Sequence, residues 1–202
     1  MRGRRSSTDN DWDRSGVILS GSAVLRNSFV HDVRFACNEE RAKRGLAGIY
    51  ATGDSKVDNC TVTRCWSKYH PGGGINIGAS ATVRNCIAYG NTGGGTKQGT
   101  GDTPIDIRGG LAPAVFANCL VGVSEDGELP EVATDCLPLG TDPMFVDSGY
   151  LLDRKSPCIN AGKRLEWTKN SVDIEGNVRR GSRPDIGCWE SDILPGLVLM
   201  IR

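Results

Sequence analysis

The feature that most constrains the fold is a short segment that recurs along the first two thirds of the chain. Each copy begins with an aliphatic residue and ends in Asn followed by Ser or Cys. The four clear copies run from Val17 to Asn27, Ile49 to Asn59, Ile75 to Asn85 and Ile105 to Asn118. The interval is 10 residues in three copies and 13 in the fourth, and a degenerate fifth copy lies at 132–137. The Asn residues recur every 26 to 33 positions, which predicts a stacked-repeat architecture.

Each copy is built from short strands that meet at Gly or Asn corners. Ile75-Asn76-Ile77 and Val83-Arg84-Asn85 alternate with a period of two, as half-buried strands do. Glycine adopts positive φ at corners without steric cost, and Asn is the next most tolerant residue there. The sequence therefore predicts an all-β chain, a parallel β-helix of about four to five coils over residues 16–138. A glycine-rich β-sandwich is the alternative, but it gives no reason for the 10-residue interval.

The repeats also predict two columns of stacked side chains. The Asn residues are expected to form a ladder from coil to coil, and the residue after each Asn is expected to point inward. The ladder residues are Asn27, Asn59, Asn85 and Asn118; the inward residues are Ser28, Cys60, Cys86 and Cys119, with Cys136 in the fifth copy. None of the eight cysteines forms a C-x-x-C pair, so a zinc ribbon has no support. We expect mostly free buried thiols in the column, with Cys158–Cys188 the first disulfide to test.

Bulk composition excludes some classes of protein. Lys plus Arg and Asp plus Glu are both 24, so the chain lacks the basic excess of a nucleic-acid-binding protein. No apolar run approaches the roughly 18 residues of a membrane span. Residues 1–15 are polar and read as a disordered or truncated segment. No resident metal or cofactor is predicted, although Ca²⁺ is compatible with the acidic turns.

The C-terminal third is a different module, with motifs that are specific in combination. They are DPMFVD at 142–147, YLL at 150–152, SPCINAG at 156–162 and DIGCWE at 185–190. This set resembles the closing segment of right-handed parallel β-helix repeat proteins of bacterial surface or secreted type, which carry a choice-of-anchor module. The resemblance implies a right-handed coil, an extracellular or cell-surface location and a module over 139–192, followed by a tail at 193–202. We expect the module to cap the open end of the coils.

Candidate site residues follow from aligning the copies on their first strand. The outward column is then Tyr50, Asn76 and Asp106, and the next one is Thr52, Gly78 and Arg108. A lyase needs a base and a cation near the carboxylate of a uronate sugar. Arg108 and Lys97 are the candidate cations, and Asp106 is a candidate either to hold a metal ion or to act in a carboxylate pair with Asp102. The plainer interpretation is a solvated polar face, with Tyr50, Asn76, Asp106 and Arg108 contacting a glycan.

Two functions therefore remain open. The first is a non-catalytic extracellular module, acting as an adhesin, a stalk or a surface that contacts a polysaccharide. The alternative is a polysaccharide lyase, or a related carbohydrate-active enzyme, that acts on uronate-containing glycans. The absence of a dense acidic cluster in the sequence favours the first.

Overall fold

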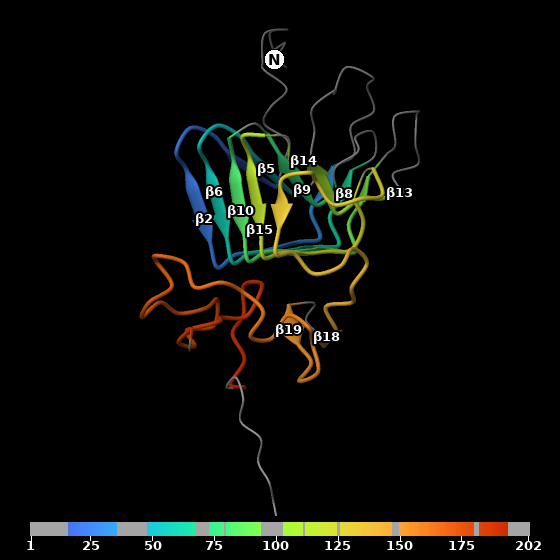
Figure 1. The fold of residues 1–202 in the computed structure, drawn as a ribbon. Helices are drawn as coiled ribbons and strands as arrows, with labels where there is room; N and C mark the ends of the chain where they lie inside the picture. Colours follow the sequence, from blue (N-terminus) through green and yellow to red (C-terminus); the bar gives the residue numbers. More distant parts are fainter. Residues whose placement is uncertain are drawn as a thin grey trace, which may run out of the picture.

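The computed structural model describes residues 16–35, 48–67, 73–78, 80–93, 103–110, 112–124, 126–146, 150–179 and 182–193. Within these ranges the protein is all-β, and no described segment is helical. Four repeats, at 17–35, 49–67, 75–93 and 103–121, each contribute one strand to each of four sheets, and we call them coils 1 to 4. The coils lie side by side in Figure 1, with the strands of successive coils stacked.

Sheets A to D are built by adding one strand from each coil. Sheet A contains β1 (Val17–Leu19), β5 (Ile49–Ala51), β9 (Ile75–Ile77) and β14 (Ile107–Gly109). Sheet B contains β2 (Val24–Arg26), β6 (Lys56–Asp58), β10 (Thr82–Arg84), β15 (Val115–Ala117) and β17 (Ala133–Thr134). Sheet C contains β3 (Phe29–His31), β7 (Thr61–Thr63), β11 (Ile87–Tyr89) and β16 (Leu120–Val121). Sheet D contains β4 (Arg34–Phe35), β8 (Trp66–Ser67), β12 (Thr92–Gly93) and β13 (Thr103–Pro104).

Pairing in these sheets is parallel and in register, except that β13 runs antiparallel to β12. Parallel neighbours that come from consecutive turns of chain are what a parallel β-helix requires. Sheet E is separate: it is an antiparallel pair of β18 (Phe145–Val146) and β19 (Leu151–Leu152) in the C-terminal module.

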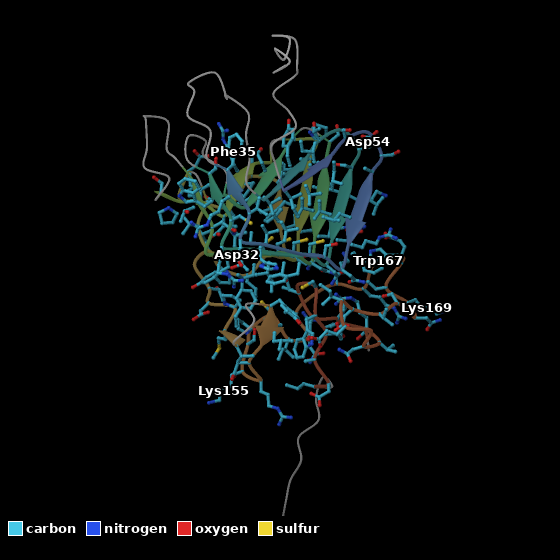
Figure 2. The ribbon with its side chains drawn as sticks, turned by 180° about the vertical axis from the view of Figure 1, so that it is seen from behind. Asp32, Phe35, Asp54, Lys155, Trp167 and Lys169 are labelled. Carbon is cyan, nitrogen blue, oxygen red and sulfur yellow. The ribbon has the colours of Figure 1, made fainter. Side chains whose placement is uncertain are left out.

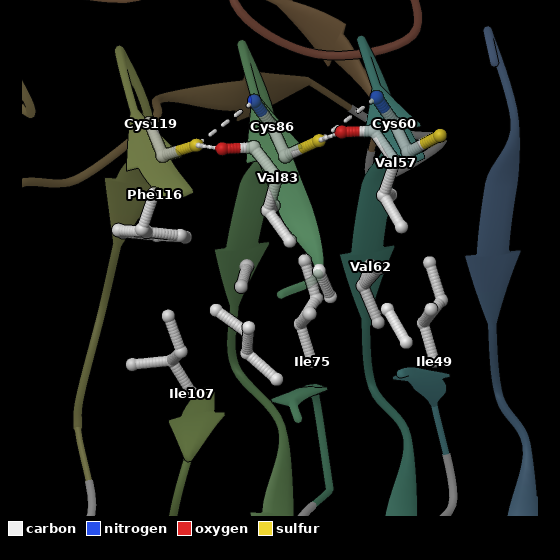
Figure 3. Packing of buried hydrophobic residues seen from close by; sticks show 14 of the residues in the cluster. Ile49, Val57, Cys60, Val62, Ile75, Val83, Cys86, Ile107, Phe116 and Cys119 are labelled. Atoms are coloured by element: carbon white, nitrogen blue, oxygen red, sulfur yellow. Dashed lines mark hydrogen bonds between the residues drawn. The ribbon is translucent and has the colours of Figure 1, made fainter. Parts of the chain in front are cut away.

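The core is a stack of small and aliphatic side chains between the sheets. Sheet A contributes Ile49, Ile75 and Ile107, each at most 1% exposed. Sheet B contributes Val57, Val83 and Phe116 at the facing positions. Figure 3 shows these layers repeating from coil to coil, with the sulfurs of Cys60, Cys86 and Cys119 in a line above them. With so few aromatic residues, the interior is filled by branched aliphatic and Cys side chains.

The Asn residues that end each copy lie at the corner between sheets B and C. Asn27, Asn59, Asn85 and Asn118 have φ of 46°, 50°, 52° and 53°, and Asp135 continues the series at 52°. The backbone N–H of each Asn donates to a carbonyl of the next turn, that of the residue just before the corresponding Asn or Asp. Examples are Asn59 N to Arg84 O at 3.0 Å and Asn85 N to Ala117 O at 3.1 Å. Left-handed backbone is tolerated best by Gly, Asn and Asp, which explains the residue choice. A second left-handed column, Asp32, Arg64 and Gly90, turns the chain from sheet C to sheet D.

The C-terminal module lies along the side of the coils, and the expectation that it caps their end is wrong. It lies against sheet C and the Asn corner, next to coils 1 to 4 (Figure 1). The reason is that Ile87 and Leu120 point outward from sheet C and need apolar cover. They pack against Leu152, Cys158 and Ile186 of the module, in a cluster separate from the main core. The end beyond coil 4 is covered instead by the segment at 123–139, through Leu129, Val132 and Leu139.

Candidate functional site

One outward row crosses sheet A, and it differs from the predicted one. Tyr50 pairs in register with Asn76, and Asn76 pairs with Arg108. Their strand neighbours Ile49, Ile75 and Ile107 point into the core. The three side chains are half-buried and lie about 4.8 Å apart, which is the strand spacing. We call Tyr50, Asn76 and Arg108 the sheet A row.

The placement of Asp106 in that row is wrong, because the fourth copy is shifted by two residues. Its aligned strand begins at Ile107, which pairs with Ile75, and Arg108 consequently leaves the column of Thr52 and Gly78. Asp106 itself is only 1% exposed. It lies at the entry to coil 4, where its own N–H and that of Ile107 both donate to the Val123 carbonyl.

The Asp106 carboxylate is occupied by protein donors. Oδ1 accepts from Asn91 N and Asn91 Nδ2, both at 2.7 Å, and Oδ2 accepts from Val123 N at 2.8 Å. Burial raises the pKa of Asp106 to about 6, although these hydrogen bonds act in the opposite direction. Asn91 in turn accepts from Cys65 N and donates to the Val62 carbonyl. The group therefore fixes the corner of coils 3 and 4 and offers no oxygen to a substrate on sheet A.

The remaining predicted catalytic residues, Lys97 and Asp102, lie outside the described residues. In the described part of the chain, no three His, Cys, Asp or Glu side chains are arranged to hold a metal ion. In the acidic turn at Asp173, one oxygen of the carboxylate is bound by backbone N–H groups of the same turn. Oδ1 accepts from Glu175 N and Asn177 N, both at 2.8 Å. Oδ2 accepts from Glu190 N at 2.8 Å. This turn is a structural element of the module.

The Asn column is a docking seam for the C-terminal module. Asn85 and Lys163 form a two-way pair, in which Asn85 Nδ2 donates to the Lys163 carbonyl at 2.7 Å and Lys163 N donates to Asn85 Oδ1 at 2.9 Å. Asn59 Nδ2 donates to the Asp185 carbonyl at 3.2 Å. Asn27 Oδ1 accepts from Arg179 Nη2 at 2.7 Å. The Asn side chains of coils 2 and 3 thus bind backbone groups of the module, and the Asn side chain of coil 1 binds an arginine of the module.

Charged side chains hold the module at two further places. Arg179 is 5% exposed and pairs with the equally buried Glu190 at 3.0 Å. Outside sheet B, Asp58 accepts from Arg84 at 2.9 and 3.1 Å and from Trp167 Nε1 at 3.0 Å. Trp167 lies where the module meets the coils, as Figure 2 shows. A charged group without a partner is costly at such positions, so these pairs specify how the module sits.

An open groove of about 540 Å³ continues the seam beyond Asn85. Its lining includes Asn118, Asp135, Cys136, Lys163, Ser182 and Arg183. No described residue hydrogen-bonds to the Asn118 side chain, in contrast to Asn27, Asn59 and Asn85. Sequence reasoning missed this groove, because it exists only where a coil corner and the module meet.

Cys158 and Cys188 are both buried free thiols, so the pairing that the sequence put first for testing is not formed in the structure. Their backbones occupy separate pairings: Ile186 N donates to the Cys158 carbonyl, and Cys188 N donates to Thr61 Oγ1 at 3.1 Å. The Cys158 thiol belongs to the apolar cluster beside sheet C and Cys188 lies next to Thr61, and burial raises the pKa of each thiol to about 12.

Comparison with known proteins finds no matching family model, no matching curated protein and no matching solved structure. A search of the described residues for a helix long and apolar enough to cross a bilayer finds none. The sheet A row and the groove therefore have to be interpreted from their own chemistry.

Proposed function

We propose that the chain is a right-handed parallel β-helix of bacterial surface or secreted type, with a choice-of-anchor-like module docked on its side. In this proposal it is a non-catalytic extracellular module, an adhesin or stalk whose sheet A face contacts a polysaccharide. The resemblance of the motifs at 142–190 and the parallel, in-register sheets support this assignment. The location outside the cell rests on the resemblance alone.

The sheet A row is the observation that carries the proposal. Tyr50 offers an aromatic face to the C–H face of a sugar ring, and Asn76 offers a donor and an acceptor to hydroxyl groups. Arg108 contributes the positive charge of a guanidinium group, which suits the carboxylate of an acidic sugar. The three residues lie in register on successive strands, so an extended chain laid across the strands meets them in turn. The predicted ligand is accordingly a uronate-containing polysaccharide.

The lyase alternative lacks a base on this face within the described residues. The sheet A row contains no carboxylate, and the Asp106 oxygens accept hydrogen bonds from Asn91 and Val123. A general base has to reach the proton that it removes, and a buried carboxylate at the coil corner does not. We therefore favour binding over cleavage.

The test is a calorimetric titration of the full chain with polygalacturonate and with alginate, each carried out with and without Ca²⁺. We expect binding that weakens by about tenfold for Arg108→Ala, which corresponds to about 1.4 kcal/mol. Lys56→Ala is the matched control, because Lys56 is an exposed cation on sheet B. A panel of neutral glycans should bind less tightly.

Two outcomes contradict the proposal. Absence of binding to any acidic polysaccharide would remove the glycan role and leave a stalk. Equal weakening by Lys56→Ala would show that the charge of the whole surface, and no particular face, governs binding. In parallel, the absorbance of unsaturated chain ends should stay flat during the incubation, and an increase would support the lyase.

A further inference from the structure

The inward column of sulfur atoms connects coils 2, 3 and 4 with the segment that follows coil 4. Register places Cys60, Cys86, Cys119 and Cys136 at equivalent positions. The backbone N–H of each of the first three points at the sulfur of the next: Cys60 to Cys86 at 3.4 Å, Cys86 to Cys119 at 3.3 Å and Cys119 to Cys136 at 3.4 Å. Figure 3 shows the first two of these contacts. The thiols are therefore a continuous file of neighbours.

Only the last thiol of the file is accessible. Of the seven cysteines in the described residues, six are buried and Cys136 alone is partly exposed. It opens into the groove that also contains the cationic residues Lys163 and Arg183. The interaction with Cys119 lowers the pKa of Cys136, whereas burial raises the pKa of Cys119 well above its ordinary value. The two neighbours thus differ in the property that decides which thiol reacts first.

We propose that Cys136 is a peroxide-sensitive thiol and that Cys119 is its resolving partner, so that oxidation links coil 4 to the segment that follows it. The Cys136 thiolate attacks one oxygen of a hydroperoxide, the O–O bond breaks, and Cys136 becomes a sulfenic acid as hydroxide or alkoxide leaves. The Cys119 sulfur, after losing its proton, then attacks the Cys136 sulfur. The S–S bond forms and water leaves. Two thiols are oxidised, and one hydroperoxide is reduced.

The geometry allows this bond. Ala117 pairs with Thr134, so Cys119 and Cys136 are two positions further along the same parallel neighbours. Adjacent strands are about 4.8 Å apart, and disulfides form at Cα separations of about 4.4–6.8 Å. Cys136 follows the last, two-residue strand β17 (Ala133–Thr134), which is at the edge of sheet B and pairs with a strand on one side only. Cys60 and Cys86 lie in the middle of the stack and are at most 1% exposed. This inference does not depend on the proposed glycan binding.

The chain offers a direct readout. Trypsin cleaves after Arg108 and Arg154, and the peptide between them contains Cys119 and Cys136 as its only cysteines. We expect that hydrogen peroxide, added to the reduced full chain, lowers the mass of this peptide by about 2 Da, the two hydrogens lost on oxidation. Cleavage after Glu125, Glu128 or Glu131 should then leave the two halves joined until a reductant is added.

Two variants separate the roles. In Cys119→Ser, Cys136 should accumulate as a sulfenic acid that dimedone traps, and no internal link should form. Ser is compatible with the column, because Ser28 occupies the same position in coil 1. In Cys136→Ser, peroxide should leave Cys119 reduced. Cys86→Ser is the matched control and should retain the 119–136 link; circular dichroism verifies that each variant is folded.

The proposal is overturned if Cys136 only gains oxygen in the unmodified sequence, without a link to Cys119. It is also overturned if another pair of cysteines forms first, or if Cys136 stays reduced while Cys158 or Cys188 reacts. A link that forms equally fast in Cys86→Ser and in the unmodified chain supports a reaction confined to the exposed end of the column.

Discussion

The coils and the C-terminal module reach an ordered structure in opposite ways. In coils 1 to 4 every strand pairs with a strand of a neighbouring turn, and similar side chains recur at the same places. The module has only one pair of two-residue strands, β18 and β19, among its described residues. Its buried groups include Arg179, Asp185 and Glu190, whereas the interior of the coils is aliphatic.

This difference indicates that the module depends on the coils for its shape. Its own apolar cluster includes Ile87 and Leu120, which belong to sheet C. Its backbone is held by side chains of Asn59 and Asn85. The coils, in contrast, have a separate core whose buried residues all lie between Leu19 and Val121. We therefore expect perturbations of the module to leave the coils folded, and perturbations of the seam to release the module first.

The largest effect should come from Arg179→Met. Removal of the cation breaks the buried ion pair between Arg179 and Glu190, and breaking such a pair costs about 3–5 kcal/mol. It also removes the donors to Asn27 Oδ1 and to the Gly187 carbonyl. Urea unfolding followed by Trp fluorescence should show early release of the module, which contains Trp167 and Trp189.

Arg154→Met is the control for Arg179→Met, because Arg154 is exposed within the same module. It should change the free energy of unfolding little. Far-ultraviolet circular dichroism of Arg179→Met should keep its β signal after Trp fluorescence has changed. A single transition seen by both probes would show that coils and module unfold together.

The next largest effect should be a difference in stability between Asn85→Gly and Asn118→Gly. Both have left-handed backbone at equivalent positions, and Gly accepts that conformation in either place. Asn85→Gly deletes the pair with Lys163, and it leaves a backbone donor and acceptor of the module without partners. We expect a loss of about 2–4 kcal/mol in the free energy of unfolding, measured by chemical denaturation.

Asn118→Gly removes an amide that no described residue bonds, so its effect should stay below about 1 kcal/mol. The comparison holds φ and column position constant, and it varies the contact with the module together with the hydrogen bond from Asn85 Nδ2 to Asn59 Oδ1 at 3.3 Å. Equal losses at the two sites would show that stacking along the column, and not docking, stabilises the Asn residues.

Asp106→Asn should have a smaller effect that depends on pH. The pKa of Asp106 rises from 3.8 to about 6 on folding, so the folded protein takes up a proton between these values. Stability from this group is fully present below pH 4 and is lost as pH rises through 6. The difference in unfolding free energy between the unmodified protein and Asp106→Asn should therefore grow on going from pH 7 to pH 4, by an amount on the order of 2 kcal/mol.

Asp54→Asn is a control for Asp106→Asn, because Asp54 is exposed and should show no comparable trend. Denaturation curves at three or four pH values suffice. A stability difference that shrinks on acidification would mean that the hydrogen bonds from Asn91 and Val123 outweigh burial.

The sequence was sufficient to predict all-β coils, because each turn of the chain needs one residue at positive φ and Asn fills that position. The Asn therefore recurs once per turn, whatever residues the neighbouring strands contain. It was insufficient for the register of coil 4. Ile105 and Ile107 are both aliphatic and both buried, so the alternating pattern fits either as the start of the strand. What decides is Asp106, whose carboxylate bonds Asn91 and Val123, and those partners are distant in sequence.

The lateral position of the module was likewise beyond a pattern-based prediction. Ile87 and Leu120 read as ordinary strand residues, and nothing local indicates that they face outward from sheet C. The sheet A row was found only in part for the same reason: Tyr50 and Asn76 were placed together, but Arg108 joined them through the shift in register. Contacts between repeats follow from spacing, whereas contacts between regions depend on surfaces that exist only after folding.

The smallest effect should come from extending the sulfur column into coil 1. Ser28 is partly exposed, and its Oγ donates to the carbonyl two residues earlier at 2.8 Å, the same contact that Cys86 Sγ makes with Arg84 O at 3.1 Å. Ser28→Cys keeps this contact and replaces a hydroxyl with a less polar thiol beside Cys60. We expect the free energy of unfolding to rise by no more than about 1 kcal/mol, because little of the site is buried. The reverse change in the interior, Cys86→Ser, should cost about 1–2 kcal/mol, since a hydroxyl there is cut off from water. Denaturation curves would contradict this expectation if Ser28→Cys raised the free energy of unfolding by as much as Cys86→Ser lowers it. In that case coil 1 would be packed as tightly as the middle coils, although Ser28 is partly exposed.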